Sequence, residues 1–141
     1  MFATLNNPAA AYSAAGIETI ADTADAHELI LMLFDGALVS ISLAAHHLKS
    51  ENIAAKGENI SKAIDIIENG LKVSLDYRSG GALAERLGAL YEYMCHRLLH
   101  ANLRNDKAVL EEVSGLLREL KSAWEEIGKD RTVVSPNKAA A

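Results

Sequence analysis

The chain has 141 residues, the length of one ordinary domain built around one hydrophobic core. Its formal net charge is -5, and its 14 lysines and arginines are scattered among 19 acids, which argues against a nucleic-acid-binding surface because phosphate binding needs a clustered positive field. The single cysteine, Cys95, excludes a disulfide framework, and the N-terminal residues lack the basic and apolar regions of a signal peptide. We therefore expect a cytoplasmic protein.

Four helices are predicted in chain order. Both prolines, Pro8 and Pro136, lie outside the periodic part of the chain, so neither interrupts a helix. The first helix begins with a capping box at Asp25 and Glu28, and Asn105 is expected to cap the fourth. The sequence SGG gives the break between the second and third helices. The predicted ranges are residues 25–49, 52–77, 82–103 and 105–128.

Similar helix lengths and short connections favour antiparallel neighbours. The expected fold is all-α, an antiparallel up-and-down four-helix bundle over residues 25–128. A flexible N-terminal segment with a short helical part is expected over 1–24, and a disordered tail over 129–141. The longest run of large apolar residues, LILMLF, falls far short of the ~20 residues that span a bilayer, so no membrane span is expected.

The first helix is unusually apolar. Its polar side chains form one thin line made by Glu28, Asp35, Ser42 and His46, and the remaining faces need cover. Leu31 and Leu38 flank this line, where packing among four helices does not obviously bury them. The third and fourth helices carry ordinary core stripes; the third is Leu83, Leu87, Leu90, Met94, Leu98 and Ala101, and the fourth is Val109, Val113, Leu116, Leu117, Leu120, Trp124 and Ile127.

The second helix carries two apolar stripes. The core stripe is Ile53, Ile60, Ile64, Ile67, Leu71 and Leu75, and the second stripe is Ala63, Ile66, Gly70, Val73 and Tyr77. A mid-helix glycine costs ~1 kcal/mol relative to alanine, so Gly70 indicates that another backbone comes close. Two explanations stay open: self-packing, by a fifth helix or a homodimer, or a groove for a foreign amphipathic helix.

Five segments of the chain resemble one known family. They are AYSAAGIET at 11–19, LILMLFDGAL at 29–38, SLDYRSGG at 74–81, LYEYMCHRLLHANLRND at 90–106 and AWEEIG at 123–128. In this order they resemble the flagellin export chaperones of the FliS family. The resemblance covers residues 11–128, and five ordered motifs are far more specific than any single one.

The resemblance implies a cytoplasmic, non-enzymatic helical bundle without a cofactor. Such a protein binds the disordered C-terminal segment of flagellin in a hydrophobic groove, prevents premature polymerisation and helps deliver the subunit to the flagellar type III export gate. Its N-terminal segment, here Tyr12 to Ile17, covers part of the groove when no client is bound. From helical spacing we expect the groove at Leu31, Leu38, Ala63, Ile66, Gly70, Val73 and Tyr77.

Two other functions remain as alternatives: a histidine phosphotransfer bundle and a helical oligomerisation module. The segment AHHLKSENIAAKG resembles a phosphotransfer motif, with His46 as phosphoryl carrier and Lys49 as its electrostatic support. Ser50 stands where that motif has glycine, and His46 is at a helix end, so a solvated histidine is the preferred interpretation.

His96 and His100, with Glu92 one turn earlier, have a spacing that can bind zinc. No second pair of cysteines or histidines completes such a site, so an exposed polar face is preferred and no metal is expected. Cys95 falls on the apolar side of its helix, which favours a small core residue over a nucleophile.

Overall fold

The computed structural model describes the backbone of residues 26–140 and the side chains of residues 26–129. It consists of four long helices, α4 (Ala26–Lys49), α5 (Ile53–Ile66), α6 (Tyr77–Arg104) and α7 (Lys107–Ala140). A π-helical turn, η2 (Ile67–Leu71), and a 3-10 turn, η3 (Lys72–Ser74), continue α5. The predicted N-terminal segment, with Tyr12 and Ile17, lies outside the described residues.

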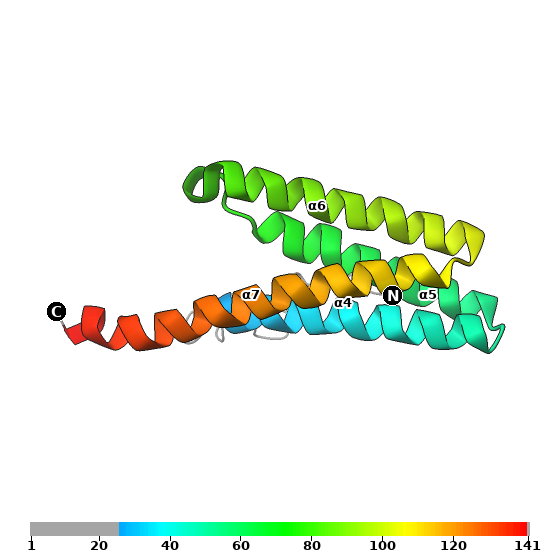
Figure 1. Cartoon of the computed structure of the whole chain (residues 1–141), viewed down its shortest axis with the longest axis horizontal. Helices are drawn as coiled ribbons and strands as arrows, with labels where there is room; N and C mark the ends of the chain where they lie inside the picture. The colour runs from blue at the N-terminus through cyan, green and yellow to red at the C-terminus, as the bar shows by residue number, and fades with distance from the viewer. Residues whose placement is uncertain (1–25, 141) are drawn as a thin grey trace.

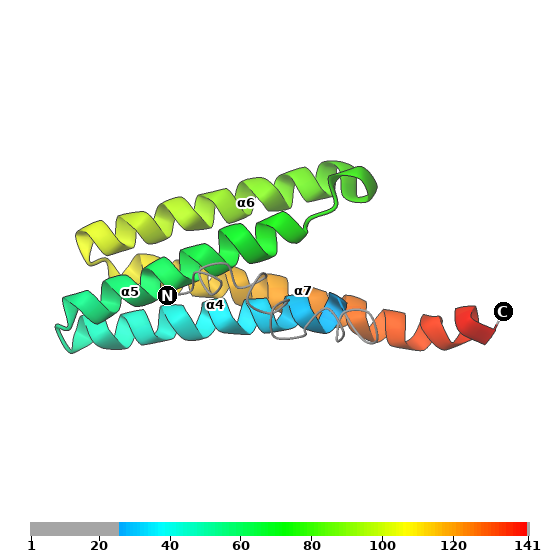
Figure 2. The same cartoon turned by 180° about the vertical axis from the view of Figure 1, so that it is seen from behind.

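The helices form an antiparallel bundle in which each packs against its neighbours in the chain and α7 returns to pack against α4 (Figures 1 and 2). Residues 26–140 contain no strand, and the predicted all-α four-helix fold is confirmed. Every helix contributes to one shared core, whose largest fully buried side chains are Leu33, Ile41, Ile60, Ile67, Met94, Leu98, Leu110, Val113 and Leu117.

Three predicted core residues are wrong: Ile53 is 49%, Leu83 62% and Ile127 47% exposed. Ile53 is the first residue of α5, so the predicted core stripe of this helix extends beyond the end of the bundle there. Leu83 lies in the first turn after the non-helical residue Gly81, near the start of α6, and it stays exposed although it shares a helix face with Leu87.

Capping at the α6–α7 connection differs by one residue from the prediction. Asn105 has φ 53 and closes α6 in the left-handed conformation, for which glycine and asparagine are the usual residues. The carboxylate of Asp106 caps α7 instead, accepting a hydrogen bond of 3.3 Å from the backbone nitrogen of Val109. At the start of α5, Asn52 accepts a 3.1 Å hydrogen bond from the nitrogen of Ala55, as a capping residue should.

The predicted break at residues 79–81 is a kink inside α6. Helical structure after α5 ends at Ser74, and α6 begins at Tyr77. Asp76 caps this new start, since its side chain accepts hydrogen bonds from the nitrogens of Arg78 and Ser79. Gly81 then has φ 51 and ψ −127, a combination that only glycine adopts easily.

The fourth helix continues past its predicted end at Gly128 to Ala140. Figure 1 shows these last turns extending beyond the start of α4 and away from the other helices. Residues 129–140, which belong to the segment predicted as a disordered tail, form these last turns.

By length and composition alone, α4 is apolar enough to cross a membrane, which the run LILMLF did not suggest. A core helix of a bundle passes the same test. Seven of its residues are buried against the rest of the chain, five of them apolar, so packing accounts for part of its apolar character; they are His27, Leu33, Phe34, Ala37, Ser40, Ile41 and Ala44.

Candidate functional site

The outer face of α4 keeps both a polar line and an apolar stripe. The four predicted polar residues, Glu28, Asp35, Ser42 and His46, are all exposed, as expected. Beside them Met32 is 41%, Val39 57% and Leu43 44% exposed. Spacings of seven and four residues place these three on one side of the helix. Part of the apolar surplus of the first helix therefore faces outward.

A hollow of about 380 Å³ lies between the second half of α4 and the first half of α7. Its volume is at the small end of the range of about 300–1,000 Å³ that is usual for ligand sites. Ile41 and Leu110 are buried, whereas Ser42 and Arg118 are exposed. The full lining is Leu38, Val39, Ile41, Ser42, Ala45, Leu110, Glu111, Ser114 and Arg118. The hollow thus combines aliphatic side chains with exposed polar ones and suits the apolar face of an amphipathic partner.

Beyond the hollow, α4 and α7 are tied together by polar contacts. Lys121 Nζ lies 2.7 Å from Asp35 Oδ1. His27 and Trp124 make two contacts, because Trp124 Nε1 donates to the His27 carbonyl at 3.0 Å and His27 Nε2 lies 2.6 Å from the Trp124 carbonyl. Their rings stack with centroids 4.9 Å apart. The hollow therefore lies in the half of the α4–α7 pair that does not contain these polar contacts.

A small residue permits the His27–Trp124 stack. A Cβ placed on Gly128 would overlap the ring atoms of His27, so only glycine allows the ring this close to α7. The AWEEIG segment, which supported the family resemblance, thus has a structural explanation: its tryptophan and glycine hold the start of α4.

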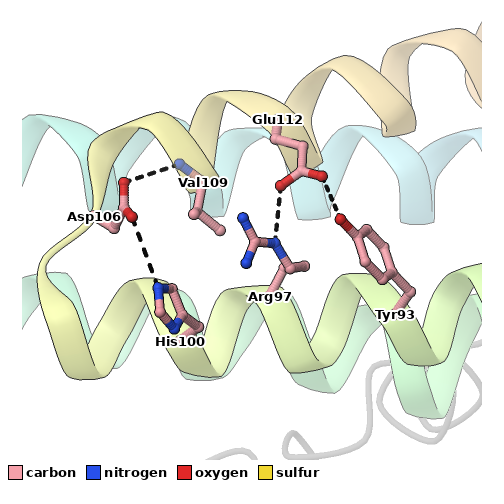
Figure 3. Close-up of polar contacts among 6 residues, drawn as sticks. All are labelled: Tyr93, Arg97, His100, Asp106, Val109 and Glu112. Carbon is pink, nitrogen blue, oxygen red and sulfur yellow. Dashed lines mark hydrogen bonds and ion pairs between the residues drawn. The ribbon is translucent and has the colours of Figure 1, made fainter.

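On its other flank, α7 is held by α6 (Figure 3). Glu112 accepts hydrogen bonds from the hydroxyl of Tyr93 and, at 2.9 Å, from Nε of Arg97. These hydrogen bonds, that of Tyr93 first, lower the pKa of Glu112. His100 Nε2 also lies 3.8 Å from Asp106 Oδ2. The first half of α7 is thus anchored from α6, which leaves its α4 flank free to line the hollow.

Only some of the predicted groove residues lie near this hollow. Leu38 lines it, and Leu31 is half-buried two turns earlier on the same face of α4. Val73 and Tyr77 are 63% and 49% exposed, but they lie near the connection between α5 and α6. These four residues do not form one continuous lining.

The other three predicted groove residues lie in the interior. Ala63 is 0% and Ile66 5% exposed, and Gly70 is buried as well. A Cβ on Gly70 would lie 3.1 Å from Cδ2 of Leu33, a residue of α4. Gly70 is therefore a point of close approach within the same chain, but the atoms that approach it belong to the side chain of Leu33 on α4 and not to another backbone.

The α7 side of the hollow was missed from sequence. The fourth helix was expected to face the core and nothing else, yet its Glu111, Ser114 and Arg118 line the hollow. The sequence feature that could have indicated the hollow was Ser114, a small residue between Leu110 and Arg118 on one side of the helix. Small side chains leave space beside a neighbouring helix.

The alternative sites have simple surroundings. His46 is exposed in the last turn of α4, and the hydroxyl of Ser50 donates to its carbonyl at 3.1 Å. Burial raises the pKa of Cys95 to about 12, which makes its thiol a poor nucleophile and confirms it as a core residue. Among the side chains that the structure describes, no three His, Cys, Asp or Glu residues are placed to hold a metal ion.

A family model described as "Flagellar protein FliS" matches residues 8–131, which is most of the chain. The chain belongs to the FliS family. The FliS match includes all of α4 and every residue that lines the hollow.

Curated FliS relatives support the same assignment. The flagellar secretion chaperone FliS of Salmonella typhimurium is 49% identical over 117 residues, 83% of this chain and 87% of the relative. Its namesake in Escherichia coli is 47% identical over 116 residues, 82% of this chain and 85% of the relative. The Bacillus subtilis FliS chaperone is 34% identical over 122 residues, 86% of each protein.

Proposed function

We propose that this protein is a flagellar secretion chaperone that binds the disordered C-terminal segment of flagellin. The chaperone keeps that segment from polymerising and delivers the subunit to the flagellar type III export gate. One observation carries the proposal: an apolar hollow with polar residues at its edge lies beside an exposed apolar stripe in a chain whose relatives are flagellar secretion chaperones.

The apolar surface on α4 is of a size that matters for binding. Ordering a disordered client consumes about 2–5 kcal/mol of the contact energy. Full burial of a large aliphatic side chain contributes about 1.5–3 kcal/mol, and Met32, Val39 and Leu43 are about half exposed, so each supplies about 1 kcal/mol. This stripe alone roughly offsets the ordering cost, and the hollow, where Leu38 remains partly exposed, supplies the surplus that appears as affinity.

The binding mode is a helix in a groove. The client folds into an amphipathic helix as it binds, with its apolar side chains in the hollow and its polar face toward water. That apolar face is the one flagellin uses to assemble, so covering it blocks polymerisation without ATP or any covalent chemistry. Binding takes place in the cytoplasm, before export.

The experiment compares two variants in a flagellin polymerisation assay. Ser42→Trp places an indole at the exposed edge of the hollow and leaves the core untouched, so it should lose most of the ability to suppress polymerisation. The matched control is Ser61→Trp, at a serine on α5 that is also exposed, which should behave as wild type. Equal suppression by both variants would contradict the placement of the client in the hollow.

The same samples test self-association. A homodimer that used the hollow would dissociate in Ser42→Trp, which sedimentation measures directly. If wild type is a dimer, Ser42→Trp is a monomer and neither binds flagellin, the hollow is an interface between copies of this chain and the chaperone proposal is wrong.

A further inference from the structure

The two charged residues of the hollow have opposite signs and lie at opposite ends. Glu111 and Arg118 are seven residues apart on α7, which is about 10 Å along the helix axis. Arg118 is exposed, and its guanidinium makes no hydrogen bond or ion pair with any other residue that the structure describes. The hollow therefore has one positive end that no neighbouring carboxylate neutralises.

The negative end is nearly as open. Glu111 Oε1 lies 3.9 Å from Lys107 Nζ, but the two side chains are 67% and 60% exposed, so solvent screens this pair. One turn beyond Arg118, Lys121 is already engaged by Asp35 at 2.7 Å. The local field along the hollow thus runs from negative at Glu111 to positive at Arg118.

An α-helix is itself polarised, with about half a positive charge at its N-terminus and half a negative charge at its C-terminus. We propose that these two charges set the direction in which the hollow binds its client helix. The N-terminal end of the helix lies at Glu111 and the C-terminal end at Arg118, parallel to α7 and antiparallel to α4. This inference rests on the proposed function, because it takes the flagellin segment as the helix that is bound.

The reverse direction places like charges together at both ends. Each favourable interaction of a charge with a helix end is worth about two- to fivefold in affinity at low salt. Two such ends give a preference of roughly tenfold for one direction, which is enough to select a single bound arrangement. Arg118 and Glu111 are then specificity residues, and the apolar hollow supplies most of the affinity.

The test uses the full chain and a peptide covering the C-terminal segment of flagellin from the same organism. Arg118→Glu should weaken binding about fivefold at low salt, and the effect should nearly vanish in about 1 M salt, where the screening length is ~3 Å. Arg86→Glu, at an exposed arginine on α6, changes the net charge equally and should leave affinity close to wild type. Circular dichroism verifies that both variants are folded.

The double variant Arg118→Glu/Glu111→Arg tests direction itself. A spin label at the start of the peptide's helical part should broaden the NMR amide signals around residue 111 in wild type. In the double variant, binding should be restored and the broadening should move to the signals around residue 118.

The possible outcomes separate the two proposals. The orientation inference is overturned, and the proposed function stands, if wild type binds the peptide but Arg118→Glu weakens binding no more than Arg86→Glu. The same conclusion follows if the broadening stays around residue 111 in the double variant. If wild type does not bind the peptide, both are overturned.

Discussion

Replacing Gly70 by leucine tests how α4 and α5 pack. A Cβ at this position would lie 3.1 Å from Cδ2 and 3.2 Å from Cδ1 of Leu33, which is 2% exposed. Leu33 has to shift to admit even one carbon, and the isobutyl group of a leucine has no space at all. We therefore expect Gly70→Leu to destabilise the bundle, with any loss of client binding following from that.

The magnitude follows from two opposing effects. Overpacking a filled core costs about 1–3 kcal/mol, and occasionally more. Replacing a helical glycine returns up to ~1 kcal/mol of backbone propensity. The net decrease in the free energy of unfolding should be about 1–2 kcal/mol, from a total that is typically about 5–15 kcal/mol for a small domain. The variant stays folded but unfolds at lower denaturant concentration.

Urea unfolding followed by circular dichroism measures this change. Val73→Leu is the matched control: it adds a leucine three residues later, where the side chain is 63% exposed, and should change stability by no more than about 0.5 kcal/mol. Leu33→Ala alone should cost about 2–5 kcal/mol. In Gly70→Leu/Leu33→Ala the new leucine can fill the space, so the double variant should lose at least about 1 kcal/mol less than the sum. Strict additivity, or a Gly70→Leu variant as stable as wild type, would refute this packing argument.

Three further predictions concern polar and reactive groups. Trp124→Phe removes the indole donor to the His27 carbonyl and should lower the free energy of unfolding by about 1 kcal/mol, measured by urea titration; an unchanged value would show that the stack needs no hydrogen bond. Hydrogen bonds, that of Tyr93 first, hold the pKa of Glu112 below its ordinary value of 4.5, so their stabilisation is present above pH 4.5 and is lost as pH falls through the lowered pKa. The stability difference between wild type and Glu112→Gln should therefore shrink on acidification, and a constant difference would contradict that linkage. Because burial raises the pKa of Cys95 to about 12, a thiol reagent at pH 8 should modify it slowly in the folded protein and rapidly in urea; equal rates would show that the thiol is accessible.

Helical periodicity predicted much of this structure. The line of Glu28, Asp35 and Ser42 is exposed, and the stripe through Val113 and Leu117 is buried, because residues that share a helix face share an environment. The same argument predicted four helices and their approximate ends. A three- to four-residue repeat is a property of one helix, so it can be recognised without knowing the partner.

Helical periodicity could not show what each helix face packs against. The stripe through Ala63, Ile66 and Gly70 has the same spacing whether it meets α4 or a foreign helix, and in the structure it meets α4. The hollow needs two helices at a known separation, so neither Leu38 nor Ser114 alone could indicate it. In both cases the sequence does not give the distance between the helices in the folded protein.

Helix ends were uncertain for a different reason. Asn105 and Asp106 are both good capping residues, and a sequence containing them in succession fits either assignment. Asparagine tolerates the left-handed conformation at the end of α6, with φ 53, whereas the carboxylate of Asp106 suits the start of α7. The cap that ends α6 must precede the cap that begins α7, so Asn105 takes the first position and Asp106 the second.

The most direct test of the proposed function is calorimetric titration of this chain with a peptide covering the C-terminal segment of flagellin from its own organism. Measurements at several temperatures give the heat-capacity change, and circular dichroism follows helix content in the same mixtures. We expect saturable binding with a negative heat-capacity change and a gain in helix, because a disordered segment folds as it buries apolar surface. The absence of binding, or binding with no heat-capacity change and no added helix, would contradict a chaperone that covers the apolar face of its client.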